Sequence, residues 1–488
     1  MTEPIRALPL DMIEAHVSPT PNKRILTSYA SWWEEKGRAI SEAIDRAGTP
    51  KLRLFDRFGN RVDELLYPPE YWEMLSEGYR AGVVWRGLEE ESLLTPYLLG
   101  YITSFYDPGL YCPYVVSLST AVPLAKYGAH QAEQFLPPLL QKDGAPWQGA
   151  TWMTEARGGS DLGAAVETAA RDCGDFWELT GDKYFCSNVG AEVAVVAARP
   201  EKGPEGLRGL ELFVVPRTRE DGRLNYTVRR LKDKLGTRSV PTGEVELRNS
   251  VGYLLGKRGM GVYLILETLN LSRVGNSMGS VALAQRALAE AWYFAQERVA
   301  FGGPIAQHPL LARQFQERLQ TLNAAWALAW EAVMLLQSVW RETPPYNDRY
   351  HLFRLVAHLA KYWTAEVAVQ FCKWAVEVHG GAGILMDLPI ERLLREAMIL
   401  PIWEGTPHRQ ILDGMEVMER KHAHRLLWAY LAERGITTDK IKPVQEEVES
   451  WLTQPKPERE AGAEGPFRHL AESVANLLAS HSTERNPS

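Results

Sequence analysis

The order of three textures along the chain, helical, then β-rich, then helical again, constrains the fold more than any other feature of the sequence. Residues 26–136 carry apolar and aromatic side chains at helical spacing. From Gly149 to about Asn249, short β-rich runs alternate with turn residues. From Gly259 on, long helical segments return. Two helical blocks around a β-rich block predict an α+β fold.

The first block is predicted to be helical throughout, behind an extended arm of residues 1–23 that is broken by four prolines. A helix is expected to start at Pro69, because proline fits the first helical position. Further helices are predicted over Glu89–Ser104, Val115–Tyr127 and Gln131–Leu140.

The middle block predicts a compact β-domain, either a barrel or a sandwich, of roughly a hundred residues. Its expected strands are Phe176–Leu179, Val193–Ala198, Leu210–Val215, Tyr226–Leu231 and Glu244–Leu247. The loops between them are rich in glycine, proline and charge, which suits turns.

The last block predicts an up-and-down bundle of four long helices. Their expected bounds are Val262–Ala300, Pro309–Leu336, Leu352–His379 and Thr406–Leu431. Gln454–Pro466 is expected to be a linker, and Phe467–Leu478 a short amphipathic helix. The predicted domains are therefore 1–148 (helical), 149–250 (β), 251–430 (bundle) and 431–488 (C-terminal extension).

Composition excludes several classes of protein. The 488 residues are 45% hydrophobic and 24% charged, which is typical of a globular chain. The net charge is −7, so the balance does not favour nucleic acid or an anionic membrane as partner. No apolar run approaches ~20 residues, and residues 1–15 lack a secretory core, so no membrane partner is expected. The four cysteines, scattered and without nearby histidines, predict no metal site and a cytoplasmic location.

The stretch Val378–Pro407 carries the features most suggestive of chemistry. It begins with glycines, including Gly380 and Gly381, whose backbone N–H groups can approach an anionic pyrophosphate. It ends with Glu404, which follows an apolar run. Apolar surroundings raise the pKa of a carboxyl group, which suits a general base. The alternative is a glycine-rich loop and a carboxylate that caps a helix.

This stretch resembles the C-terminal signature of the acyl-CoA dehydrogenase family. The resemblance consists of a GG-x-G loop, a helix with Glu391, Arg392, Arg395 and Glu396, and the turn Trp403-Glu404-Gly405-Thr406. The helical, β and helical order matches that family over about residues 26–420. By resemblance, FAD is the cofactor and Glu404 removes the α-proton of an acyl thioester.

Two motifs in the β-block resemble the flavin-binding loops of the same family. In Thr151–Asp161, the resemblance implies that Met153 and Thr154 contact the isoalloxazine ring. It also implies that Ser160 lies near both the flavin and the acyl-CoA chain. In Gly181–Asn188, it gives Phe185 an aromatic contact and Ser187 a hydrogen bond to the flavin. The alternatives are a Ser/Asp turn cap and an ordinary amphipathic strand.

The remaining assignments concern the two ends of the bundle. Arg298 and Phe301 resemble residues that reach the cofactor of a neighbouring subunit, and a helix end with a glycine stop is the alternative. By resemblance, Thr406 and His408 also contact FAD, and Gly405 the substrate. Arg273 resembles an arginine near the CoA cleft, with a structural salt bridge as the alternative.

Some details depart from the commonest form of the family and resemble its AidB-type branch. Pro309 and Glu377 stand where many members carry glutamine, and residues 231–247 and the WEGT turn follow the branch. That branch is linked to the bacterial response to DNA alkylation. Glu377 places an acid near the expected pyrophosphate, so the adenosine end must be held differently.

The resemblance predicts an enzyme of fatty acid metabolism that forms an α,β double bond in acyl-CoA. It implies hydride transfer to flavin N5, an electron-transfer flavoprotein as acceptor, and a homotetramer built as a dimer of dimers. An AidB-like protective role beside nucleic acid stays open as the alternative, although the tail carries no net basic stripe. An oxidase that uses oxygen also stays open.

Overall fold

The computed structural model describes residues 5–485, so Met1–Pro4 of the predicted arm and residues 486–488 of the predicted extension lie outside the described part. The chain forms two compact units. One unit is Arg24–Ser272, and the other combines Met1–Lys23 with Arg273–Ser488. The predicted division into four domains stays a prediction.

Helices make up most of the first half of the unit Arg24–Ser272. They are α2 (Lys23–Trp32), η1 (Trp33–Gly37), α3 (Arg38–Ala47), α4 (Pro69–Ala81), α5 (Trp85–Glu89), α6 (Leu94–Tyr106), α7 (Pro108–Tyr127) and α8 (His130–Leu139). The predicted start at Pro69 is confirmed. At the start of α7, the side chain of Asp107 accepts a hydrogen bond from Leu110 N, which is an N-cap. α6 and α7 are buried along almost their whole length, so they form the centre of this helical block.

The prediction that residues 26–136 are helical throughout is wrong at the hairpin of β1 (Lys51–Phe55) and β2 (Arg61–Leu66). Charged and apolar side chains alternate along β1, which is the period of a strand. The Asp56 carboxylate accepts hydrogen bonds from backbone N–H groups of the turn, and Gly59 has φ +84°. The hairpin packs its leucines against the β-rich core.

The prediction of an extended arm over residues 1–23 is wrong for α1 (Pro9–His16). Pro9 occupies the first helical turn, where its missing N–H costs nothing. The Asp11 carboxylate accepts a hydrogen bond from Leu8 N, which gives the N–H of the N-cap residue a partner. Prolines in the arm therefore mark the start of a helix as well as breaks.

The β-block is a closed barrel, which is one of the two predicted forms, barrel and sandwich. Seven strands of the described residues form the sheet: β3 (Gly149–Trp152), β4 (Ala169–Asp172), β5 (Trp177–Ser187), β6 (Val193–Pro200), β7 (Glu211–Pro216), β8 (Thr227–Leu231) and β9 (Thr242–Leu254). The ring β6–β4–β5–β9–β7 closes because β7 pairs again with β6. β3 adds to β6 in parallel, and β8 adds to β9. Closure leaves few open edges.

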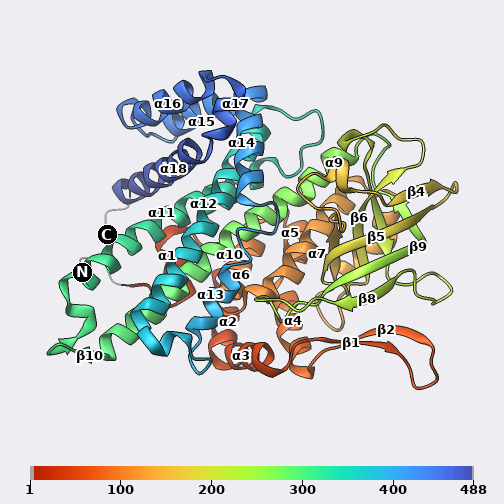
Figure 1. The fold of residues 1–488 in the computed structure, drawn as a ribbon, viewed down its shortest axis with the longest axis horizontal. Coiled ribbons are helices and arrows are strands. Elements are labelled where there is room, and N and C mark those ends of the chain that lie inside the picture. The colour runs from red at the N-terminus through yellow and green to blue at the C-terminus, as the bar shows by residue number, and fades with distance from the viewer. Residues whose placement is uncertain (1–4, 486–488) are drawn as a thin grey trace. The chain divides into compact units, whose positions relative to one another are not determined.

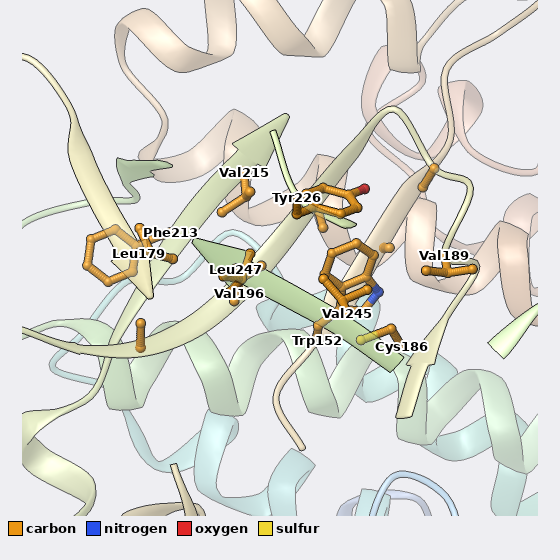
Figure 2. Close-up of a cluster of buried hydrophobic side chains, with 14 of the residues drawn as sticks. Trp152, Leu179, Cys186, Val189, Val196, Phe213, Val215, Tyr226, Val245 and Leu247 are labelled. Atoms are coloured by element: carbon orange, nitrogen blue, oxygen red, sulfur yellow. The ribbon is translucent and has the colours of Figure 1, made fainter. Parts of the chain in front are cut away.

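The barrel interior is filled by side chains from opposite walls. Figure 2 shows Trp152, Cys186, Val196, Phe213 and Val245, which come from five different strands, converging on this core. Inward positions alternate with outward ones along each strand, so the outer positions remain available for contacts. The short α9 (Leu162–Ala165) and η2 (Leu207–Gly209) lie in loops of the barrel.

The C-terminal helices follow the predicted bundle with two corrections. Their bounds are α10 (Gly261–Glu297), η3 (Ile305–Gln307), α11 (Pro309–Val339), α12 (Asp348–His379), η4 (Gly380–Ile384), α13 (Ile390–Ala397), α14 (Pro407–Lys421) and α15 (Ala423–Glu433). α10 ends at Glu297, and not at Ala300, because the chain turns into a hairpin there. The predicted helix Thr406–Leu431 is broken at His422, which has φ +53°.

The extension contains more helix than predicted. The predicted linker Gln454–Pro466 is wrong, since α17 (Lys456–Ala461) and the start of α18 (Glu464–Arg485) lie in it. With α15 and α16 (Thr438–Thr453), these helices gather beside α14 (Figure 1). α18 packs on α11 and α12, so the extension is part of this unit's core.

The fold class is confirmed as α+β, with helical segments on both sides of a β-barrel in the sequence. Among the described residues, no helix combines the length and the apolar character that crossing a bilayer requires.

Candidate active site

Glu404 lies in a tight turn between α13 and α14. Its φ is +59°, and that of Gly405 is +102°. A left-handed conformation is uncommon for a residue with a β-carbon and persists only where the surroundings impose it. The φ of Gly405 favours glycine, and a β-carbon there would also lie 2.7 Å from the Gln410 amide nitrogen, which is itself bound to the turn.

Side chains from three helices hold the carbonyl oxygens of this turn. Arg273 Nε of α10 donates to Glu404 O at 3.1 Å, and Gln410 Nε2 of α14 donates to the same oxygen at 2.9 Å. Lys361 Nζ of α12 donates to Gly405 O at 2.6 Å. The backbone of the turn is therefore fixed from three directions.

The carboxylate of Glu404, in contrast, makes no hydrogen bond or ion pair with any described residue. Burial raises the pKa of Glu404 to about 7, and the charges of Arg273 and Lys361 act in the opposite direction. A half-buried carboxylate with this pKa can accept a proton near neutral pH.

A second set of contacts orients the side chains that hold the turn. His358 Nδ1 lies 2.8 Å from Gln410 Oε1, and burial lowers the pKa of His358 to about 3, so the imidazole is neutral. Asn276 Nδ2 donates to Leu400 O at 3.2 Å, and its side-chain oxygen accepts from the indole of Trp403. Both ends of the turn are thus tied to helices.

Arg273 is buried and used within the protein. Besides its bond to Glu404 O, its guanidinium lies 3.5 Å from Asp413 Oδ2, so the structural alternative given for this residue is realised. Its predicted contact with the substrate stays a prediction.

The glycine loop begins at the C-terminal end of α12. Gly380 has φ +59°, and a β-carbon on Gly380 or Gly381 would meet nothing within 4 Å. Gly383 is packed against Val376 O, where a β-carbon would lie 2.5 Å away. The first two glycines therefore present open backbone. Glu377, whose negative charge would repel a pyrophosphate, forms an ion pair with Lys373.

Arg298 and Phe301 belong to the hairpin of β10 (Val299–Ala300) and β11 (Gly303–Pro304). Phe301 and Gly302 form its two-residue turn, and both have positive φ, as a type I′ turn requires. The Phe301 side chain is 98% exposed. Arg298 is exposed and makes no side-chain hydrogen bond or ion pair with the residues the structure describes.

Thr406 is the N-cap residue of α14, but its hydroxyl makes no capping bond. His408, on the first turn of that helix, is exposed. These two residues are therefore close in sequence to Glu404 and have side chains that remain available for a ligand.

In the barrel unit, Met153 and Thr154 follow directly after β3. Met153 is buried and Thr154 is half-buried, with Gly159 packed against its side chain. Ser160 is exposed, next to Asp161, whose carboxylate caps α9 by accepting from Ala164 N. The cap fixes the loop and leaves the Ser160 hydroxyl outward.

Phe185 and Ser187 lie at the end of β5, where the pairing with β9 contains a bulge. Lys183 pairs with Val245 and Cys186 with Gly243, so two residues of β5 face one of β9. A bulge re-aims side chains. Lys183 and Cys186, on the two sides of the bulge, are buried, while Phe185 within it is 54% exposed. The Ser187 hydroxyl has no hydrogen-bond partner in the described part of the chain.

The two barrel motifs are joined to each other. Tyr184 N donates to Thr154 O at 3.0 Å, and the indole of Trp152 donates to Ser187 O at 3.1 Å. A buried ion pair links the same two segments, with Lys183 Nζ 2.7 Å from an oxygen of Glu155.

Three further donors complete this link. The N–H groups of Glu167 and Thr168 and the Thr168 hydroxyl also donate to Glu155, so its buried carboxylate is fully satisfied. Together these contacts hold the segment after β3, which carries Met153 and Thr154, against β5, which carries Phe185 and Ser187.

These residues fit FAD within each unit. In the barrel unit, an exposed aromatic ring and an unpartnered hydroxyl lie two residues apart on β5. In the other unit, the open backbone of Gly380 and Gly381 and the exposed Arg298 suit a pyrophosphate, which guanidinium groups bind well. The described residues contain no group of three or more His, Cys, Asp or Glu that could hold a metal ion.

Sequence reasoning missed the residues that hold the site together. Lys361, Gln410 and His358 lie outside the sequence motifs described above. A lysine inside an apolar and aromatic helix run, as at Lys361, was the available signal, because a buried cation needs partners.

Three family models match most of the chain. A model of the AidB adaptive response protein N-terminal domain matches residues 9–144. The acyl-CoA dehydrogenase middle domain matches residues 150–250, and the acyl-CoA dehydrogenase C-terminal domain matches residues 259–418.

Known relatives agree with these models. Acyl-CoA dehydrogenase family member 11 of Caenorhabditis elegans is 30% identical over 86% of this chain and 72% of its own. The putative acyl-CoA dehydrogenase AidB of Escherichia coli (strain K12) is 28% identical over 80% of this chain and 74% of its own. The solved structure of Caenorhabditis elegans ACDH-11 in complex with C11-CoA has a TM-score of 0.82 at 26% identity, covering 98% of this chain and 86% of that one.

Proposed function

The chain belongs to the acyl-CoA dehydrogenase family, in its AidB-type branch, and we propose that it forms an α,β double bond in an acyl-CoA thioester with Glu404 as the base. It is an FAD-dependent enzyme of this family. The observation that carries the proposal is a fixed turn with one carboxylate that has no partner among the described residues and a pKa of about 7.

Glu404 takes the α-proton in this proposal. Bound FAD supplies the acceptor for the hydride that leaves the β-carbon. The backbone N–H of Glu404 has no acceptor among the described residues, so it can donate to the thioester carbonyl and acidify the α-carbon. Gly405 adjoins this position without a side chain that would block the substrate.

The cofactor is held in this proposal by the two sets of residues described above. Thr154, Phe185 and Ser187, with Met153 and Ser160, bind the flavin ring. Arg298, Phe301 and the backbone of Gly380 and Gly381 bind the adenosine and pyrophosphate, and Thr406 and His408 also contact FAD. The complex of ACDH-11 with C11-CoA supports an acyl-CoA ligand for this chain.

Anaerobic titration with acyl-CoA thioesters of different chain lengths tests the proposal. The yellow flavin absorbance of the purified holoenzyme is expected to bleach with at least one of them, because the reducing equivalents pass to FAD. The free acids without CoA serve as the control. If no thioester in a panel of short, long and branched acyl groups bleaches the flavin, the proposed reaction is wrong.

The rate of this reduction is expected to rise with pH through about 7 and then level off. Only the ionised carboxylate accepts a proton, and the pKa of Glu404 is about 7, so activity is lost as the pH falls. Stopped-flow measurement of flavin reduction across neutral pH checks this. A rate that is the same on both sides of neutrality would rule out a base with this pKa.

We also propose a homotetramer that uses an electron-transfer flavoprotein, acts in fatty acid metabolism and lies in the cytoplasm. Only the oligomer has support in the structure: Phe301 and Arg298 are exposed, which suits a ligand shared with a neighbouring subunit. Sedimentation of the holoenzyme checks the tetramer.

A further inference from the structure

Lys361 is a buried cation that donates hydrogen bonds directly to the Glu404 turn. It belongs to α12 and is 1% exposed. Its Nζ donates to Pro401 O at 2.7 Å and to Gly405 O at 2.6 Å. These two carbonyl groups stand on either side of Glu404 in the sequence. One ammonium group therefore closes the turn around the carboxylate-bearing residue.

The charge of Lys361 interacts mainly with Glu404 in that turn. No described carboxylate lies within ion-pair distance of Lys361. Burial lowers the pKa of Lys361 to about 7, and Glu404 is the strongest of the acidic groups that oppose this effect, ahead of Glu366 of the same helix. In return, the charge of Lys361 lowers the pKa of Glu404, against the effect of burial.

Arg273, the other cation that binds the turn, has a carboxylate partner. Arg273 of α10 also donates to Glu404 O, but its guanidinium lies 3.5 Å from Asp413 of α14, which partly compensates its charge. Arg273 also acts on Lys361 and lowers its pKa. Among the groups that face the turn, Lys361 is therefore the cation without a carboxylate of its own.

We propose that Lys361 is a positioning residue for the reaction: it fixes the turn by binding the carbonyls on both sides of Glu404, and its charge favours the ionised carboxylate. The inference rests on the proposed function, since it assigns Glu404 as the base. It explains how a half-buried carboxylate can be a base at neutral pH without a hydrogen bond that would weaken it.

Lys361→Met tests the proposal because methionine keeps the unbranched shape and most of the length of the side chain and removes the charge and the donors. The midpoint of the pH profile for flavin reduction is expected to move up by about one unit, the effect of removing one nearby opposite charge. At pH 7 the ionised fraction of Glu404 would drop from about one half to about one tenth, so the rate should fall about fivefold there and recover in part at higher pH. Retention of FAD shows that the variant is folded.

A purely structural role gives a different result. If Lys361 only held the backbone, the rate would fall by the same factor at every pH and the midpoint would stay, which would overturn the proposal. Lys361→Gln keeps an amide donor without the charge, so it should show the same shift with a smaller loss at high pH. It decides the question if the methionine variant does not fold.

A matched control and a second readout separate this inference from the proposed function. Lys442→Met removes an exposed lysine of α16 that pairs with Glu446, and should leave the midpoint unchanged. Thermal stability read against pH reports the ionisation of Glu404 without any substrate, as the difference between each protein and its Glu404→Gln counterpart.

The difference in melting temperature between each protein and its Glu404→Gln counterpart changes with pH as Glu404 ionises. The midpoint of that change is expected at a higher pH in the Lys361→Met background than in the wild type. An equal midpoint in both backgrounds contradicts the role of Lys361, whatever the activity. If acyl-CoA never bleaches the wild-type flavin while the stability midpoint does shift, the proposed function fails and the effect of Lys361 on Glu404 stands.

Discussion

Glu404→Gln is expected to keep FAD bound and to slow flavin reduction by acyl-CoA by about 10²–10⁴-fold, the usual contribution of a positioned general base. Glutamine keeps the shape of the side chain but cannot accept the α-proton. The contacts of Arg273, Gln410 and Lys361 go to carbonyl oxygens of the turn, so they survive the substitution. The measurement is anaerobic stopped-flow reduction of the purified variant.

The stability of this variant provides an internal control. The pKa of Glu404 is raised in the folded state, so the folded protein binds more protons than the unfolded chain between the ordinary pKa of 4.5 and about 7. The contribution of Glu404 to stability is therefore present at low pH and is lost as the pH rises to about 7. Glu404→Gln, which cannot ionise, should melt at the same or a higher temperature than the wild type above pH 7.

Glu416→Gln is the matched control. It makes the same chemical change on α14, at a carboxylate whose partner is Arg420 on the surface. A surface pair of this kind contributes little, about 0–1 kcal/mol, so rate and stability should stay near the wild type. Unchanged flavin bleaching in Glu404→Gln would remove this residue from the reaction.

The sequence predicted the long elements well because each repeats one period many times. α12 is an example, since its apolar side chains keep helical spacing over most of 32 residues. The strands β6 and β7 were predictable for another reason, as continuous apolar runs bounded by turn residues. It failed where a short element had to be distinguished from its surroundings. The β1–β2 hairpin has strands of five and six residues, too short to separate period two from the helical pattern around them.

The break at His422 shows a different limit. Apolar side chains continue in helical spacing on both sides of it, so periodicity cannot reveal one residue in a left-handed conformation. The same holds for Glu404, whose positive φ depends on side chains that come from distant parts of the chain.

The candidate site divides in the same way. Glu404 and the glycine loop lie within one short stretch and could be predicted together. Lys361 on α12 contacts the turn from forty or more residues earlier in the chain, and Glu155 meets Lys183 across a separation of 28 residues. Spacing in a sequence carries no information about such pairs without an alignment of related chains.

Phe467→Ala, in the C-terminal extension, is expected to lower the free energy of unfolding by about 3–5 kcal/mol, as for other buried phenylalanines. The Phe467 side chain is 0% exposed, and its ring lies 5.4 Å from that of Tyr362 on α12. It also packs directly on Gly414 of α14. The measurement is chemical unfolding of the holoenzyme, followed by far-UV circular dichroism.

The result distinguishes two views of the extension. If residues 431–488 formed an independent domain, this substitution would destabilise that part alone, and a separate early transition would appear. The packing of α18 on α11 and α12 predicts instead that the transition of the helical bundle moves. Phe58→Ala, which truncates a ring that is 74% exposed, is the control and should change stability by about 0.5 kcal/mol or less.

A double-mutant cycle sharpens the test at the contact with α14. A β-carbon at position 414 would lie 2.5 Å from the Phe467 ring, so Gly414→Ala must displace the ring and should cost about 1–3 kcal/mol. In the Phe467→Ala background the ring is absent, and the cost of Gly414→Ala should largely disappear. Equal costs in both backgrounds would mean that the extension does not pack on α14 in solution. Loss of the cost would place the extension against the helix that begins beside the Glu404 turn.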